Sequence, residues 1–139
     1  MKHWIAITVA CLVALTALSA CGDDDNAPDD ARASAVGAMS ENAVDAWIAD
    51  GAAGLHDYLA TSVTVHCSVA ALETALAGQP TPTAWRNTKD FGFPAEDEAN
   101  ATVIVVRDGK DVEQAWSFKL EGNDWRITAM PGLEGCTSS

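Results

Sequence analysis

The strongest constraint on the fold of this chain is the alternation of side chains over residues 112–120. One set of positions carries Val112, Gln114, Trp116, Phe118 and Leu120, and the positions between them carry Glu113, Ser117 and Lys119. A period of two is typical of a strand with one buried face. The strand before it, residues 101–107, is rich in β-branched residues. Asp108-Gly109 lies between the two strands, and this dipeptide favours a two-residue hairpin turn.

The pattern extends the hairpin on both sides into an antiparallel meander. "EGND" predicts a further turn, and residues 125–129 predict a closing strand with Trp125 and Ile127 on the core side. Residues 84–91, which include Trp85, predict a strand before the hairpin. "PAEDEAN" predicts a polar loop between this strand and the hairpin. The predicted sheet has one apolar face that other elements must cover.

The residues before the sheet favour helices. Apolar side chains recur every three or four residues from Ala35 to Asp50, and Gly51 ends this amphipathic helix. A shorter helix is expected over 52–59, and a third from Ser68, its N-cap, to residue 77, with Gly78 as its stop. "SVTVHC", residues 62–67, is ambiguous between a short strand and an extended entry into that third helix. Helices followed by a meander predict an α+β fold in which the helices cover the sheet.

The N-terminal residues are typical of an export signal. Lys2 precedes an apolar run from Trp4 to Leu18, which is short for a membrane span and ends in small residues. A transmembrane anchor is the alternative, because the run approaches the minimum span. The tetrapeptide 18–21, Leu-Ser-Ala-Cys, resembles the lipobox of bacterial lipoproteins, in which the cysteine becomes an acylated N-terminus. We therefore expect a signal peptide over 1–20, lipidation at Cys21, and anchoring to the outer face of the cytoplasmic membrane.

Acidic residues follow the cysteine and dominate the charge of the chain. Asp23, Asp24, Asp25, Asp29 and Asp30 predict an extended, solvated tether over residues 21–34, with the folded domain over 35–139. A calcium loop would need oxygen ligands at alternating positions and then a glycine, and Ala27 and Pro28 interrupt that spacing. The net charge of −12 and the lack of a basic stripe argue against a nucleic-acid partner.

Cysteine counting predicts one disulfide. Cys11 leaves with the expected signal peptide and Cys21 is acylated, so Cys67 and Cys136 remain in an exported domain, where thiols usually pair. The alternative is a zinc site that adds His56 and His66 to the two cysteines. It lacks a close C-x-x-C or H-x-x-x-H pair, so we expect the disulfide and no metal.

The order of elements carries a resemblance to a known superfamily. "AVDAWIADGAAGLHDYLA", followed by a helix and a Trp-rich meander, resembles the NTF2-like (cystatin-like cone) superfamily over about residues 35–136, and in particular small exported lipoproteins of actinobacteria. The resemblance implies a curved antiparallel sheet with the N-terminal helices packed in its concave face, around a cone-shaped cavity. The superfamily includes isomerase-type enzymes and many non-catalytic modules, so function must be argued from a site.

The residues favour binding over catalysis. The inward strand positions hold no carboxylate or histidine, no nucleophile or cofactor motif is found, and no cofactor is expected. The enzymatic alternative, an isomerase or dehydratase, would use His56 and Asp57, and a third alternative is a structural module for an envelope protein partner. We expect a cavity for a small apolar ligand, with core packing as the competing role for each aromatic. The candidate lining residues are Trp47, Tyr58, Trp85, Gln114, Trp116 and Trp125.

Overall fold

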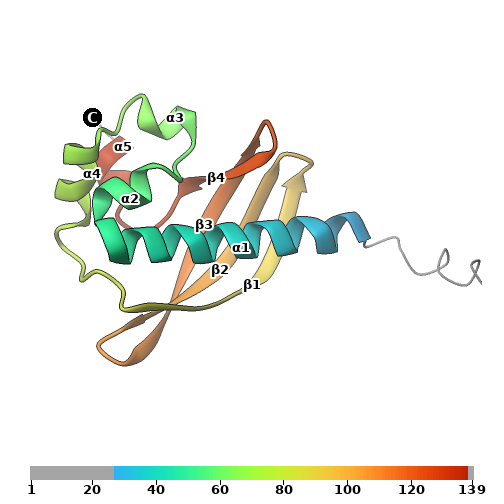
Figure 1. Cartoon of the computed structure of the whole chain (residues 1–139). Helices are drawn as coiled ribbons and strands as arrows, with labels where there is room; N and C mark the ends of the chain where they lie inside the picture. Colours follow the sequence, from blue (N-terminus) through green and yellow to red (C-terminus); the bar gives the residue numbers. More distant parts are fainter. Residues whose placement is uncertain (1–26, 138–139) are drawn as a thin grey trace, which may run out of the picture.

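The computed structural model describes residues 27–137, which fold as helices followed by a curved antiparallel sheet (Figure 1). The helical part comprises α1 (Ala27–Asp50), α2 (Ala52–His56), α3 (Thr61–Thr64) and α4 (Val69–Leu76). The sheet comprises β1 (Ala84–Ala95), β2 (Glu98–Arg107), β3 (Lys110–Glu121) and β4 (Asp124–Ala129), and a short helix, α5 (Glu134–Thr137), follows. The predicted α+β class is confirmed. Among the described residues no helix is both long and apolar enough to cross a membrane.

The sheet is a simple meander with the order β1-β2-β3-β4. Asp108 and Gly109 both have positive φ, 51° and 72°, as a two-residue hairpin between β2 and β3 requires. Ala101 pairs with Trp116 and Val103 with Gln114 across that hairpin. The predicted turn at Asp108-Gly109 and the strand alternation are therefore both correct.

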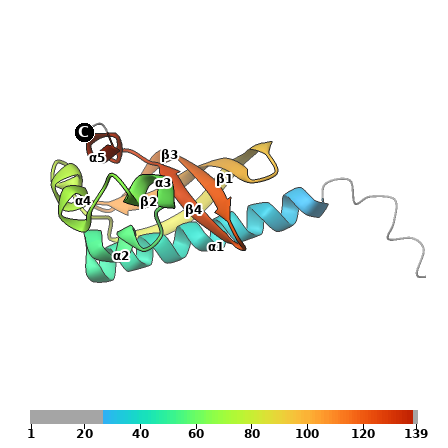
Figure 2. The same cartoon turned by 90° about the horizontal axis from the view of Figure 1, so that it is seen from above.

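Helix α1 covers one face of the sheet, and the other helices lie near the C-terminal end of α1 (Figures 1 and 2). The inward positions of β3 supply Trp116 and Phe118, each 1% exposed, whereas Glu113 on the other face is exposed. α1 contributes Val36, Val44 and other apolar residues to the same core. This packing fills the space between α1 and the sheet.

The two edges of the sheet are protected in different ways. At β4, the Ala60 N–H donates to the carbonyl of Ile127 at 2.8 Å, and the Ile127 N–H donates to the carbonyl of Tyr58 at 2.9 Å. At β1, register shifts interrupt the pairing with β2, and Asp90 has a φ of 54°. Bulges of this kind make an edge a poor template for another strand.

The expectation of an extended tether is wrong for residues 27–34, because α1 begins at Ala27. Arg32 explains this early start. Its guanidinium forms an ion pair with Asp29, donates to the carbonyl of Ala95 at 3.2 Å, and lies 4.3 Å from the ring centre of Phe93. These contacts dock the first turns of α1 on β1. Residues 21–26 of the expected tether lie outside the described residues.

Three further segments differ from their predictions. Residues 61–64 form a helical turn, not a strand or an extended entry, and the helix expected over 52–59 ends at His56 because the next residues bond to β4. The expected loop "PAEDEAN" shrinks to a turn at residues 96–97, because β1 and β2 extend to Ala95 and Glu98. By contrast, Ser68 caps α4 as predicted, since its hydroxyl accepts the Ala71 N–H at 3.1 Å.

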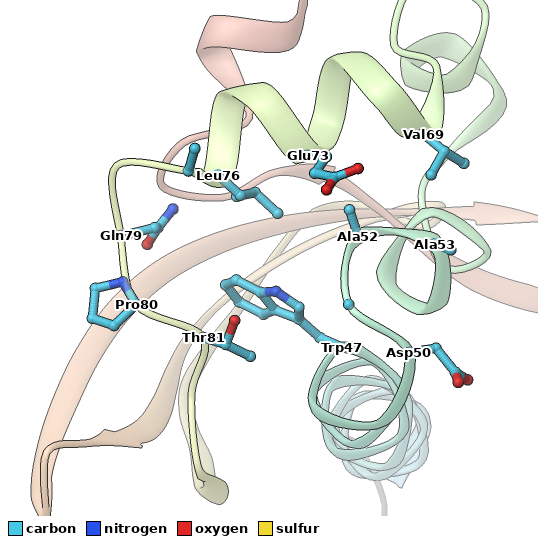
Figure 3. Close-up of a pocket in the computed structure, with 12 residues that line it drawn as sticks. Trp47, Asp50, Ala52, Ala53, Val69, Glu73, Leu76, Gln79, Pro80 and Thr81 are labelled. Carbon is cyan, nitrogen blue, oxygen red and sulfur yellow. The ribbon is translucent and has the colours of Figure 1, made fainter.

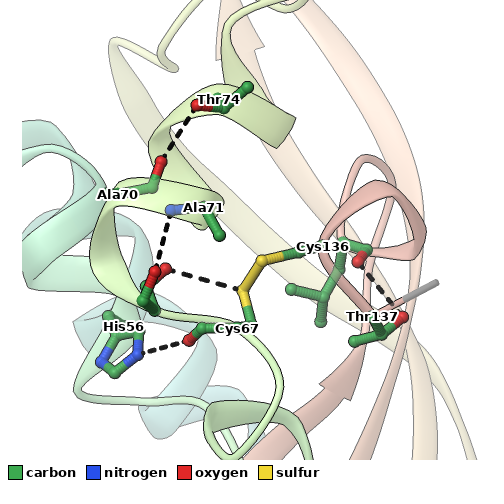
Figure 4. The surroundings of a disulfide bond; sticks show 9 residues. His56, Cys67, Ala70, Ala71, Thr74, Cys136 and Thr137 are labelled. Carbon is green, nitrogen blue, oxygen red and sulfur yellow. Dashed lines mark hydrogen bonds between the residues drawn. A yellow bond between two sulfur atoms is a disulfide. The ribbon is translucent and has the colours of Figure 1, made fainter. Parts of the chain in front are cut away.

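The predicted disulfide between Cys67 and Cys136 is confirmed (Figure 4). Their Cα atoms lie 5.3 Å apart, and both side chains are buried. The bond joins the residue before the cap of α4 to α5. The alternative zinc site is therefore wrong, because both of its thiols are used in this bond. The residues that the structure describes contain no cluster of three or more His, Cys, Asp or Glu side chains suited to a metal ion.

Candidate functional site

A groove of about 570 Å³ lies where the C-terminal end of α1 meets α2, α4 and the segment that leads to β1 (Figure 3). Its volume is within the range of small-molecule sites. Its walls are Trp47, Asp50, Gly51, Ala52, Ala53, Val69, Glu73, Leu76, Ala77, Gln79, Pro80 and Thr81. Residues far apart in the sequence thus form one concave surface, and Figure 3 shows the indole of Trp47 lying among them.

Among the tryptophans of residues 27–137, Trp85 and Trp116 have a side-chain partner for the indole N–H, whereas Trp47 and Trp125 have none. Trp85 donates to the Thr88 hydroxyl at 3.1 Å, and Trp116 donates to the Gln114 amide oxygen at 3.0 Å. Trp47 is only 3% exposed, yet its Nε1 donates to no residue that the structure describes. Within the same residues, no fully buried side-chain nitrogen or oxygen lacks a partner. The Trp47 N–H must therefore retain access to solvent, which the groove provides.

Arg107 holds the wall of the groove behind Trp47. Its guanidinium lies 5.6 Å from the ring centre of Trp47 and donates to the carbonyl of Pro80 at 2.8 Å and to the Gln79 amide oxygen at 3.1 Å. Gln79 in turn donates to the carbonyl of Pro131 at 2.8 Å. Burial lowers the pKa of Arg107 below its usual value. These contacts make the loop after α4 a fixed wall of the groove.

The charge on the groove walls is negative. Asp50, the last residue of α1, and Glu73, in the middle of α4, both line it, and no lysine or arginine does. Neither carboxylate forms an ion pair with any residue between 27 and 137. The groove therefore presents one aromatic wall with a free N–H donor and the Glu73 carboxylate, while the exposed Asp50 carboxylate is directed away from Trp47 and Glu73 at the edge of the groove (Figure 3).

Two smaller grooves lie elsewhere on the domain. One, of about 320 Å³, lies between α1 and the β3–β4 turn and includes Tyr58, Trp125 and Arg126. The other, of about 330 Å³, lies against the outer face of the sheet and includes Asn100, Ser117 and other residues of β2 and β3. On that outer face Lys89 contacts Glu113 at 2.6 Å, and this hydrogen bond raises the pKa of Lys89.

The structure does not bring the six expected ligand-binding residues together in one cavity. Trp47 lines the first groove, whereas Tyr58 and Trp125 line the second. The other three, Trp85, Gln114 and Trp116, belong to the inner face of the sheet. The physical reason is that α1 packs directly on that face. The Gln114 amide oxygen accepts the Trp116 N–H, and Gln114 is not among the residues that line the three grooves.

His56 and Asp57, the enzymatic alternative, have structural contacts. The His56 Nε2 donates to the carbonyl of Cys67 at 2.8 Å, which ties the end of α2 to the disulfide (Figure 4). Asp57 is exposed, and its carbonyl accepts a hydrogen bond from Arg126. Neither residue lines the groove at Trp47.

No protein-family model, curated protein or solved structure matches this chain. The groove must therefore be interpreted from its own chemistry.

The sequence interpretation missed Asp50 and Glu73, and of the two only Asp50 has an unusual position in the sequence. Asp50 ends a helix, where the exposed carbonyls disfavour a negative charge. Glu73 is the one charged residue of the otherwise uncharged helix "VAALETAL". Asp50 is thus a charge placed against local preference, which can indicate a functional position, whereas Glu73 is a good helix former at an exposed helical position.

Proposed function

We propose that this protein is an exported, lipid-anchored binding protein with an NTF2-like domain, which holds a small, partly apolar ligand in the groove at Trp47 without transforming it. The observation that carries the binding role is the Trp47 indole, which is almost wholly buried, keeps an N–H donor without a partner among residues 27–137, and lines the groove of about 570 Å³. Trp125 shares the unpartnered N–H but lines the smaller groove of about 320 Å³. Buried tryptophans usually satisfy this donor within the protein. A ligand oxygen or nitrogen in the groove would satisfy it here.

The shape of the groove supports binding of a small molecule. Val69, Leu76 and Pro80 offer apolar surface, and Trp47, Asp50 and Glu73 offer polar groups. The lining exposes more polar than apolar surface, so the groove suits a ligand that carries polar groups beside a small apolar part. A catalytic role has less support, because His56 is tied to a backbone carbonyl and is not among the residues that line this groove.

The order of elements supports the proposed relationship to the NTF2-like superfamily. Helices precede a curved four-stranded meander, and the longest helix crosses one face of it. In this chain the face beneath α1 is filled by side chains such as Trp116 and Phe118. The proposed ligand site is therefore at the end of α1 and not beneath it.

The lipobox-like residues 18–21 support the proposed membrane anchor, although they lie outside the described residues. Residues 22–26 separate Cys21 from the start of α1, and the groove lies at the opposite end of that helix. A helix of 24 residues is about 36 Å long at 1.5 Å per residue. This arrangement keeps the groove away from the anchored end of the domain.

Ligand-observed NMR on the mature domain would test the binding role, with small aromatic probes that are neutral, cationic or anionic. We expect at least one probe to bind the wild type. Ala53→Trp should abolish that binding because it fills the groove, and Trp47→Phe should weaken it because it keeps an aromatic side chain, although a smaller one, and removes the N–H. The control Ala70→Trp places the same side chain at an exposed α4 position that is not part of the groove walls. Equal effects of Ala53→Trp and Ala70→Trp would contradict the site.

Replacement of the predicted acylation site would test the anchor. Cys21→Ala should move the protein from the membrane fraction to the soluble fraction, because the thiol that would carry the acyl chains is gone. Mass spectrometry of the native N-terminus should find an acylated Cys21 in the wild type. A free Cys21, or continued membrane association of the variant, would show that the anchor is not there.

A further inference from the structure

We infer that the ligand of this groove is an organic cation, a small apolar molecule that carries an ammonium group and a hydrogen-bond acceptor. This inference rests on the proposed function and names its ligand class. The first support is charge complementarity, because Asp50 and Glu73 line the groove without ion-pair partners among residues 27–137. An anionic ligand would be repelled by both carboxylates.

The second support is the orientation of the two longer helices at the groove. α1 ends at Asp50 and α4 ends at Leu76, and both of these residues are groove walls. Helix C-termini expose carbonyl groups and carry partial negative charge, which favours a nearby cation. Neither helix has a basic residue in its last turn to satisfy this preference. The start of α2 also borders the groove, but this helix has only five residues.

The third support concerns the nearest cation of the protein itself. Arg107 lies against the Trp47 ring but is absent from the groove walls, and its guanidinium is engaged by Pro80 and Gln79. Its acceptors are neutral, so Arg107 keeps its positive charge, but it lies behind the Trp47 ring, whereas both carboxylates belong to the groove walls. The Trp47 N–H then selects an acceptor on the same ligand, and Val69, 38% exposed at the rim, offers apolar contact.

Matched probes would test the charge class. The 4-methoxy derivatives of benzylammonium, benzyl alcohol and benzoate, named below by their parent compounds, share an aromatic body and a methoxy acceptor for the Trp47 N–H and differ in charge. Their dissociation constants can be measured by NMR titration at 20 mM and 300 mM salt. We expect benzylammonium to bind at least fivefold more tightly than benzyl alcohol at low salt and to lose most of that advantage at high salt, since screening weakens exposed charge interactions. Benzoate should bind more weakly than the alcohol.

Matched variants test whether the two groove carboxylates cause the preference for a cationic probe. Glu73→Gln and Asp50→Asn should each weaken benzylammonium binding about threefold, and together about tenfold, with little effect on benzyl alcohol. Glu41→Gln and Asp45→Asn are the controls, because both carboxylates are exposed on α1 and neither lines the groove. If the controls weaken binding equally, the attraction comes from the overall charge of −12 and the inference is overturned.

The outcomes separate this inference from the proposed function. If benzyl alcohol or benzoate binds best, and Ala53→Trp abolishes that binding, the groove is a ligand site but the cation class is wrong. If none of the probes binds the wild type, both the cation class and the proposed binding role are contradicted.

Discussion

At the scale of single residues, Gly54 is the tightest point of the helical part of the domain. A methyl group at this position would overlap the carbonyl of Ala46 in α1. We expect Gly54→Ala to lower the free energy of unfolding by about 1–3 kcal/mol, because α2 must move away from α1. Urea denaturation of the purified domain measures this change.

Gly78 provides the matched control. A Cβ atom there meets nothing within 4 Å, and the residue follows the last turn of α4. Gly78→Ala should leave the stability unchanged or raise it by about 0.4–1 kcal/mol, because it restricts the unfolded chain. Equal destabilisation by both variants would show that α2 does not approach α1 so closely.

At the scale of elements, Asp50 at the C-terminus of α1 lowers the stability of the helix, and the same residue belongs to the proposed binding groove. Asp50 places a negative charge at the negative end of a 24-residue helix, and the last turn has no basic residue to offset it. We expect Asp50→Asn to raise the free energy of unfolding by about 0.3–1 kcal/mol at low salt, although the same change weakens cation binding. Thermal and urea denaturation at two salt concentrations would measure the change in the free energy of unfolding.

Asp45→Asn is the control at this scale. Asp45 is also exposed on α1 but precedes the last turn, where the effect of the helix terminus fades. Asp45→Asn should change the free energy of unfolding by less than Asp50→Asn does. A loss of stability in Asp50→Asn would mean that the carboxylate has a structural partner and that its role is not ligand binding.

At the scale of the whole molecule, the disulfide links the helical part to the end of the chain. It joins Cys67 and Cys136, which are 69 residues apart in sequence. In the chain-entropy model a loop of this length stabilises the fold by about 4 kcal/mol. The double variant Cys67→Ala and Cys136→Ala should lose stability of that order, which urea denaturation would detect as a lower midpoint.

Reduction of the wild type offers an independent check of the same bond. Thiol counting on the unfolded, non-reduced domain should find neither Cys67 nor Cys136 free, and a reductant should lower the wild-type midpoint toward that of the double variant. A double variant as stable as the oxidised wild type would show that the bond does not stabilise the native domain.

Local patterns in the sequence were sufficient for the meander and the cap of α4, and a count of the cysteines was sufficient for the disulfide. The alternation over 112–120 reflects burial of one face, and Asp108-Gly109 adopts positive φ at low cost, so these predictions depend on neighbouring residues alone. The Ser68 cap is equally local. The cysteine pair followed from counting, because only two thiols remained in the expected mature domain after the assignments to Cys11 and Cys21.

The start of α1 and the composition of the groove were decided by tertiary structure. Arg32 fixes the first turns of α1 through the carbonyl of Ala95, 63 residues away, and the segment after α2 bonds to β4. The tryptophans look alike in the sequence, but docking of α1 buries Trp116 in the core and leaves the Trp47 N–H open to a groove. Local preference determines which strands and turns form, whereas contacts between distant segments determine which side chains stay accessible to a ligand.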